Sequence, residues 1–147
     1  MTAIHNLRAV RQRCAAGRPL EPELAGWLAQ SLEAFLNRRC ESLEVAFGLI
    51  APQGGVPWWL EEGIRRRNDA IRDLAYMVAP GRSLSAQARI VGKLSVRYAA
   101  SAWRYDQHLG ELPTNYIDTV KDPLWRAFSS GAAMPLSERH LRAILAP

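Results

Sequence analysis

The sequence has no apolar run long enough to cross a membrane. Its longest purely apolar runs span only a few residues, and its first residues, M-T-A-I-H-N-L-R-A-V-R-Q-R-C, hold no apolar segment of the kind that marks a secretory signal. We therefore expect a cytoplasmic protein with no membrane partner. The sequence also has only two cysteines, Cys14 and Cys40, and no C-x-x-C pair, so we expect reduced, partly buried thiols and no disulfide.

Signatures of catalysis and of metal binding are also missing. The three histidines, His5, His108 and His140, fall in separate predicted helices and show no H-x-x-x-H or Cys-His spacing. No G-x-S-x-G motif occurs, and the Gly54-Gly55 pair lies in a loop, residues 50–57, that matches neither G-x-G-x-x-G nor a phosphate-binding loop. We therefore expect no enzymatic activity, no metal and no cofactor.

Strand patterns are absent as well, since apolar and polar residues nowhere alternate for long. Apolar residues instead recur at helical spacing, separated by proline and glycine stops. The sequence thus predicts an all-α fold, a compact single-domain bundle of about six to seven helices that covers residues 1–147. The expected helices are 2–16, 22–39, 42–48, 58–78, 85–109, 122–131 and 137–145, with a helical turn at 114–120.

The centre of the predicted bundle is an antiparallel hairpin of the helices 58–78 and 85–109. Each helix carries an apolar stripe on one face. The stripe of the second helix consists of Val91, Leu94, Tyr98, Ala102, Tyr105 and Leu109. Arg67 falls within the stripe of the first helix, and a buried guanidinium needs a partner. We expect Arg67 either to pair with an acid, such as Asp106 or Asp118, or to border a cleft.

The most conspicuous basic feature, the run Arg65-Arg66-Arg67, is expected to be largely neutralised. Glu61 and Glu62 precede Arg65 and Arg66 by four residues, the spacing of helical ion pairs. Asp69 and Asp73 lie among the same arginines. We therefore interpret these two carboxylates as members of a salt-bridged helix face and not as a metal or acid-base pair.

Local signals fix most helix ends. Ser42, Ser83 or Ser85, and Ser137 are expected N-caps, and Gly17, Gly48 and Gly131 are expected stops. Asp122-Pro123 reads as the N-cap and first residue of a helix. Leu136 and Leu141 are spaced for a hydrophobic staple around Ser137, and Cys14 is placed on the buried face of the first helix with Ile4, Leu7 and Val10.

Charge is concentrated in two acid-poor segments. Residues 1–20 hold four arginines and no acid, and residues 79–109 hold five basic residues and one acid. On a helical wheel for 85–109, four of these cations share one arc beside the apolar stripe, with Trp103 at its edge. The predicted site comprises these four, the preceding arginine and two from the first helix, namely Arg89, Lys93, Arg97, Arg104, Arg82, Arg8 and Arg13.

Part of this region resembles a helix-turn-helix motif. In A-R-I-V-G-K-L-S-V-R-Y-A-A-S-A-W-R, a turn at Ser95-Val96 would precede a recognition helix bearing Arg97, Tyr98 and Arg104. The resemblance covers some twenty residues and identifies no particular family. Ser95 stands where the motif usually has glycine, so a continuous helix through Ser95 is the favoured prediction.

Two interpretations of function follow from the basic face, and the first is favoured slightly because two separate acid-poor basic segments are harder to explain otherwise. The first is a DNA-binding protein, with DNA favoured over RNA, that contacts phosphates and dimerises if it reads bases as a regulator. The second is a helical interaction module, an adaptor or inhibitor, that binds an acidic protein surface through the same face. In that case Trp58, Trp59, Trp103 and Tyr105 would be aromatic anchors.

Overall fold

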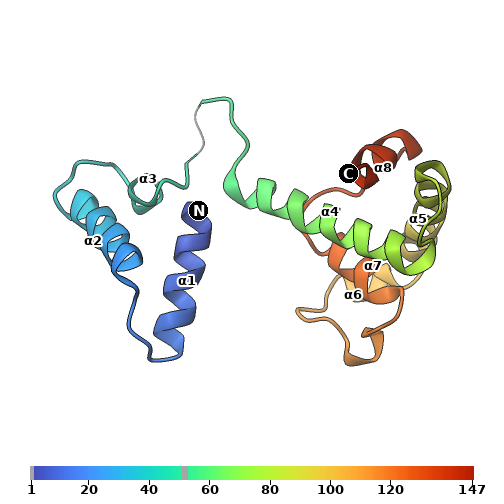
Figure 1. Cartoon of the computed structure of the whole chain (residues 1–147), viewed down its shortest axis with the longest axis horizontal. Helices are drawn as coiled ribbons and strands as arrows, with labels where there is room; N and C mark the ends of the chain where they lie inside the picture. The colour runs from blue at the N-terminus through green and yellow to red at the C-terminus, as the bar shows by residue number, and fades with distance from the viewer. Residues whose placement is uncertain (1, 51–52) are drawn as a thin grey trace. The chain divides into compact units, whose positions relative to one another are not determined.

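The chain is all-α, as its sequence predicts. The computed structural model describes residues 2–50 and 53–147, and these ranges contain helices and turns but no strand (Figure 1). Six of the α-helices in these ranges have seven residues or more, which agrees with the predicted number. The elements are α1 (Ala3–Ala15), α2 (Pro22–Leu36), α3 (Leu43–Phe47), α4 (Trp58–Val78), α5 (Leu84–Ala100), α6 (Trp103–Asp106), the 3₁₀ helix η1 (Thr114–Tyr116), α7 (Lys121–Phe128) and α8 (Glu138–Leu145).

The helices fall into two compact units, one ending at Trp58 and one beginning at Trp59. The single domain expected over residues 1–147 stays a prediction. Within the described parts of the chain, no helix combines the length and the apolar character that a membrane span needs.

The N-terminal unit contains α1, α2 and α3, with ends close to those predicted. Gly17 stops α1 with φ of +64°, and Ser42 caps α3 by accepting a hydrogen bond from the Val45 N–H at 3.3 Å. The unit buries little, since Ser31 is its only buried residue among 2–50 and 53–58. Cys14 is exposed, so its placement on a buried face was wrong, because α1 has no fully buried face.

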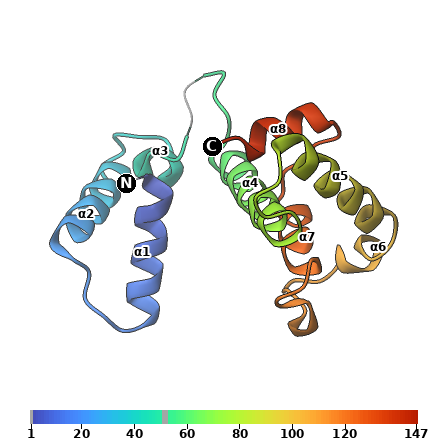
Figure 2. The same ribbon diagram turned by 45° about the vertical axis from the view of Figure 1, so that its right-hand side comes forward.

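The C-terminal unit has an apolar core to which four helices contribute. Ile71 and Leu74 of α4, Val91 of α5, Leu124 of α7 and Leu141 of α8 are almost fully buried. Figure 2 shows these helices together, with α8 packed along α5. Burial of such side chains stabilises a fold by roughly 1.5–3 kcal/mol each. This core therefore fixes α5 and α8 against each other.

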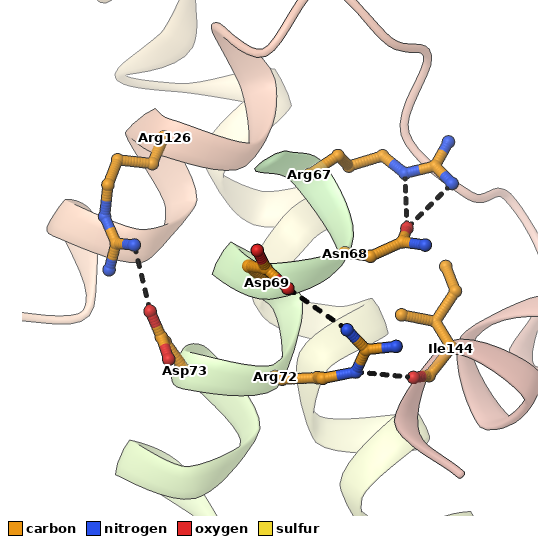
Figure 3. Close-up of polar contacts among 7 residues, drawn as sticks. All are labelled: Arg67, Asn68, Asp69, Arg72, Asp73, Arg126 and Ile144. Atoms are coloured by element: carbon orange, nitrogen blue, oxygen red, sulfur yellow. Dashed lines mark hydrogen bonds and ion pairs between the residues drawn. The ribbon is translucent and has the colours of Figure 1, made fainter. Parts of the chain in front are cut away.

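Polar contacts also tie α4 to the helices around it (Figure 3). Asp73 pairs with Arg126 of α7 at 2.9 Å, and the Arg72 Nε donates to the backbone oxygen of Ile144 in α8 at 3.1 Å. Arg72 also pairs with Asp69 at 3.2 Å. Asp69 and Asp73 thus belong to a salt-bridged face, as expected.

The predicted continuous helix 85–109 was wrong beyond Ala100. Ser83 caps α5, and α5 runs through Ser95 without a turn, as favoured, but it ends before Ser101, which has φ of −120° and ψ of −98°. The chain turns there and continues as the short α6. The apolar stripe therefore stops at Tyr98 and half-buried Ala102, and Tyr105 is 78% exposed.

The break in the helix has an identifiable cause. Tyr98 and Tyr116 both donate to the Asp106 Oδ2, at 2.7 and 2.9 Å, and Asp106 is buried. Along a continuous helix, positions 98 and 106 would lie about 12 Å apart. The chain must turn near Ser101 to bring the carboxylate back to Tyr98, and the Ser101 hydroxyl donates to the Arg97 carbonyl at the turn.

One predicted helix start and one predicted staple are corrected. The helix α7 begins at Lys121, whose N–H donates to the Thr119 hydroxyl, so Asp122 lies inside the helix and does not cap it. Pro123 is tolerated at the third position because the first helical N–H groups have no intrahelical partner anyway. Ser137 caps α8, as expected, but Leu136 is fully exposed and makes no staple with Leu141.

Replacing Gly63 by alanine is expected to destabilise the C-terminal unit. A Cβ there would lie 2.7 Å from the Ser130 carbonyl oxygen, a backbone atom, so α4 or the turn after α7 must move. Overpacking of this kind costs about 1–3 kcal/mol, more than the gain of up to about 1 kcal/mol in helix propensity. Urea unfolding followed by circular dichroism measures the difference.

Gly26→Ala in α2 is the matched control for Gly63→Ala. Nothing lies within 4 Å of a Cβ at Gly26, so only the gain in helix propensity remains, and this variant is expected to be slightly stabilised. Equal stabilisation of both variants would show that α4 and the turn after α7 can separate at little cost.

Candidate functional site: a basic groove between α5 and α8

The helix α5 presents a row of three cations. Arg89, Lys93 and Arg97 follow one another at intervals of four residues, about 6 Å along the helix axis, and all three are exposed. Their side chains make no hydrogen bond or ion pair with any residue in 2–50 or 53–147. Their positive charge is therefore not neutralised by the part of the chain that the structure describes.

A groove of about 460 Å³ lies beside this row. The three cations and Val96 line it on the α5 side, and Leu136 and Glu138 line it on the α8 side. Val96 is 72% exposed and Leu136 is fully exposed. We call this feature, with its three cations and two exposed apolar side chains, the basic groove.

The packing of α8 on α5 creates the groove. Leu141 of α8 is buried and packs over Gly92 of α5, where a Cβ would lie in ordinary van der Waals contact, 3.4 Å from the Leu141 Cδ1. Leu141 and buried Ala88 form the base of the groove. Ser137 holds the start of α8 in place through its cap, and Leu136, which precedes the cap, is left in solvent.

The groove is strongly positive. Glu138 is the one acid among the described residues that line it, against three cations. Glu138 forms no ion pair with the cations of α5 in the described structure. An anionic ligand therefore meets attraction along α5 and repulsion at one point of the opposite wall.

The structure brings together only three of the seven predicted site residues. Arg104 lies on α6, beyond the break, and Arg82 lies in the turn before α5; both are exposed, and neither lines the basic groove. Arg8 and Arg13 belong to the N-terminal unit, where Arg13 forms an ion pair with Glu21. The helical-wheel argument grouped Arg104 with α5 because it assumed one unbroken helix.

The aromatic residue expected beside the cations is part of the core. Trp103 is half-buried, with its ring centroid 6.1 Å from that of Tyr98 and 5.3 Å from that of Phe128. It therefore packs against the rings of the core and does not line the basic groove.

Two of the three arginines in the run of α4 are neutralised by the acids predicted for them. Arg65 pairs with Glu61 at 3.8 Å, and Arg66 pairs with Glu62 at 3.4 Å. Among the residues that the structure describes, no cluster of His, Cys, Asp and Glu could hold a metal ion.

Arg67 is 7% exposed, and its partners are neutral oxygens. Its Nε and Nη2 donate to the Asn68 Oδ1, at 3.1 and 2.9 Å, and its Nη1 donates to the Ala133 carbonyl at 2.6 Å (Figure 3 shows the contact with Asn68). The expected pairing with Asp106 or Asp118 was wrong, because these oxygens satisfy the guanidinium and Asp106 binds two tyrosines instead. Burial lowers the pKa of Arg67.

A second hollow, of about 770 Å³, is less suited to binding a charged ligand. Trp103, Trp125 and Phe128 line it together with Arg66 and Arg126. Both arginines already form ion pairs within the unit. Of these two hollows, the basic groove is therefore the stronger candidate site.

The sequence predicted the α5 wall of the basic groove and missed the α8 wall. The four-residue spacing of the cations could be recognised from the chain alone, whereas Leu136 was assigned to a staple. Comparison with known protein families, curated proteins and solved structures finds no match to this chain. The chemistry of the basic groove is therefore the basis for assigning a function.

Proposed function

We propose that the protein is a helical interaction module whose basic groove binds an acidic segment of a partner protein. The observation that carries this proposal is the juxtaposition of three unneutralised cations with the exposed side chains of Val96 and Leu136. Carboxylates of a partner would pair with the cations, while its apolar atoms would cover the two aliphatic side chains. Both halves of the groove then have a role in binding.

Nucleic acid is the second candidate, with DNA favoured over RNA. The observation that favours it is the regular row of cations on α5, since arginine and lysine neutralise phosphates without any further chemistry. Arg104 and Arg82 would extend the contact, Arg8 and Arg13 would add a second patch, and a base-reading regulator would act as a homodimer. We rank it second because phosphate contacts alone leave Val96 and Leu136 exposed.

Fluorescence anisotropy with two labelled probes distinguishes the two functions. The first probe is a short peptide rich in Asp and Glu that carries one leucine, and the second is a random DNA duplex. We expect the protein to bind the peptide more tightly than the duplex at the same moderate ionic strength. Both affinities fall with added salt, so the comparison is made at one salt concentration.

Tighter binding of the duplex would overturn the proposed function in favour of nucleic acid. Absence of peptide binding even at low salt would also overturn it. The control is the same peptide with every Asp and Glu replaced by Asn and Gln, and it is expected not to bind.

A further inference from the structure

We infer that the basic groove recognises a segment in which one large aliphatic side chain is flanked by carboxylates. This inference rests on the proposed function and adds what the partner must carry. Val96 and Leu136 would receive the aliphatic side chain, and the α5 cations would receive the carboxylates. Val96 and Leu136 are thus the residues that determine specificity.

The apolar half of the groove favours an aliphatic side chain over a nucleobase. Val96 and Leu136 come from opposite walls, and none of the described residues that line the groove is aromatic. Single-stranded nucleic acids are held largely by stacking of their bases on aromatic rings, which this groove does not offer. Contact with a leucine side chain of a partner would instead remove apolar surface from water on both molecules.

The shape of the groove favours a peptide segment of the partner over a flat surface of a folded partner. Its volume of about 460 Å³ lies within the range of pockets that enclose small ligands. Ala88 and Leu141 at its base are buried in the core of the unit, so the groove is formed before any partner arrives. A protruding side chain can enter such a groove without a conformational change.

The distribution of charge orients the segment. The three cations all lie on the α5 side, and Glu138 lies on the α8 side. A bound segment avoids Glu138 by placing its carboxylates along α5. The partner's aliphatic side chain then points across the groove toward Leu136.

Leu136→Ser tests the inference without disturbing the fold, because the side chain is fully exposed and stabilises nothing in the unit. The probes are the acidic peptide with one leucine and a second peptide in which serine replaces that leucine. Wild-type protein is expected to bind the leucine peptide about tenfold to a hundredfold more tightly than the serine peptide. Leu136→Ser is expected to lose most of this preference and to bind the serine peptide as the wild type does.

Ile117→Ser is the matched control, since Ile117 is 53% exposed in the C-terminal unit and does not line the groove. It should keep the full preference for leucine. Equal binding of the two peptides by the wild type, at an affinity that still depends on the carboxylates, would overturn this inference and leave the proposed function standing. Binding of neither peptide would overturn both. Tighter binding of single-stranded DNA, weakened by Leu136→Ser, would assign the groove to a nucleobase and overturn the inference.

Discussion

Simultaneous replacement of Arg89, Lys93 and Arg97 by glutamate is expected to weaken binding of the acidic peptide by about a hundredfold or more. Each substitution removes an attraction and adds a repulsion, and no acid in the described structure pairs with these side chains in the wild type. The fold should survive, because the three side chains are exposed. Anisotropy gives the affinity, and circular dichroism checks that the variant remains helical.

Two double variants distinguish the effect of charge within the groove from the effect of the protein's net charge. Arg82→Glu with Arg104→Glu changes the net charge as much as Arg89→Glu with Arg97→Glu, yet neither Arg82 nor Arg104 lines the groove. We expect the first pair to change peptide affinity only slightly and the second pair to reduce it strongly. Glu138→Gln should raise the affinity about twofold to fivefold. Equal losses for both double variants would mean that the peptide responds to overall charge and not to the groove.

Asp106→Ala is expected to lower the stability of the C-terminal unit by about 2–4 kcal/mol. Asp106 is 6% exposed and accepts hydrogen bonds from Tyr98 and Tyr116 on one oxygen. Alanine would leave both hydroxyl groups without this acceptor and would remove the contact that brings α6 back to α5. Urea unfolding monitored by tryptophan fluorescence measures the loss.

Asp106→Asn is the control for the hydrogen bonds, because its amide oxygen can still accept from both hydroxyl groups. We expect it to lose about 1 kcal/mol, less than Asp106→Ala, since both hydroxyl groups keep an acceptor although its charge is gone. A loss as large as that of Asp106→Ala would show that the negative charge, and not the geometry of the acceptor, holds the turn.

The cluster of Asp106, Tyr98 and Tyr116 should make the free energy of unfolding depend on pH in the alkaline range. Burial, together with the hydrogen bond to Asp106, raises the pKa of Tyr98, and the same two causes raise the pKa of Tyr116. A raised pKa in the folded state contributes stability that is present in full below the pKa of an unfolded tyrosine, about 10, and is lost as the pH rises above it. Unfolding free energies measured from neutral to alkaline pH should therefore fall above about pH 10, and less so in Asp106→Ala.

The sequence predicted those features of the fold that depend on neighbours within a few residues. The caps at Ser42, Ser83 and Ser137 and the stop at Gly17 each act within one turn of helix, and all are confirmed. The break after Ala100 could not be predicted in this way. It depends on a tyrosine and an acid that meet only after the chain has folded.

Long-range packing also explains what was missed at Arg67 and Leu136. The acceptor of the Arg67 Nη1 is a carbonyl 66 residues away, and no pattern in the side chains identifies a backbone oxygen. The sequence places Leu136 at the right spacing for a staple, but the packing of α8 on α5 leaves it in solvent. The row Arg89, Lys93 and Arg97 was predictable because it repeats within one straight helix, whereas the opposite wall of the groove is a product of tertiary structure.

The near absence of buried residues in the N-terminal unit has a consequence for how the chain unfolds. With Ser31 alone buried among 2–50 and 53–58, the helices α1, α2 and α3 rest on half-buried contacts, such as that of Trp27 with Phe47. Local opening of these helices exposes little new apolar surface and so requires little free energy, whereas opening of α4 and α5 exposes a core. We therefore expect the N-terminal unit to open at a lower free energy than the C-terminal unit, which hydrogen exchange of the backbone amides would measure.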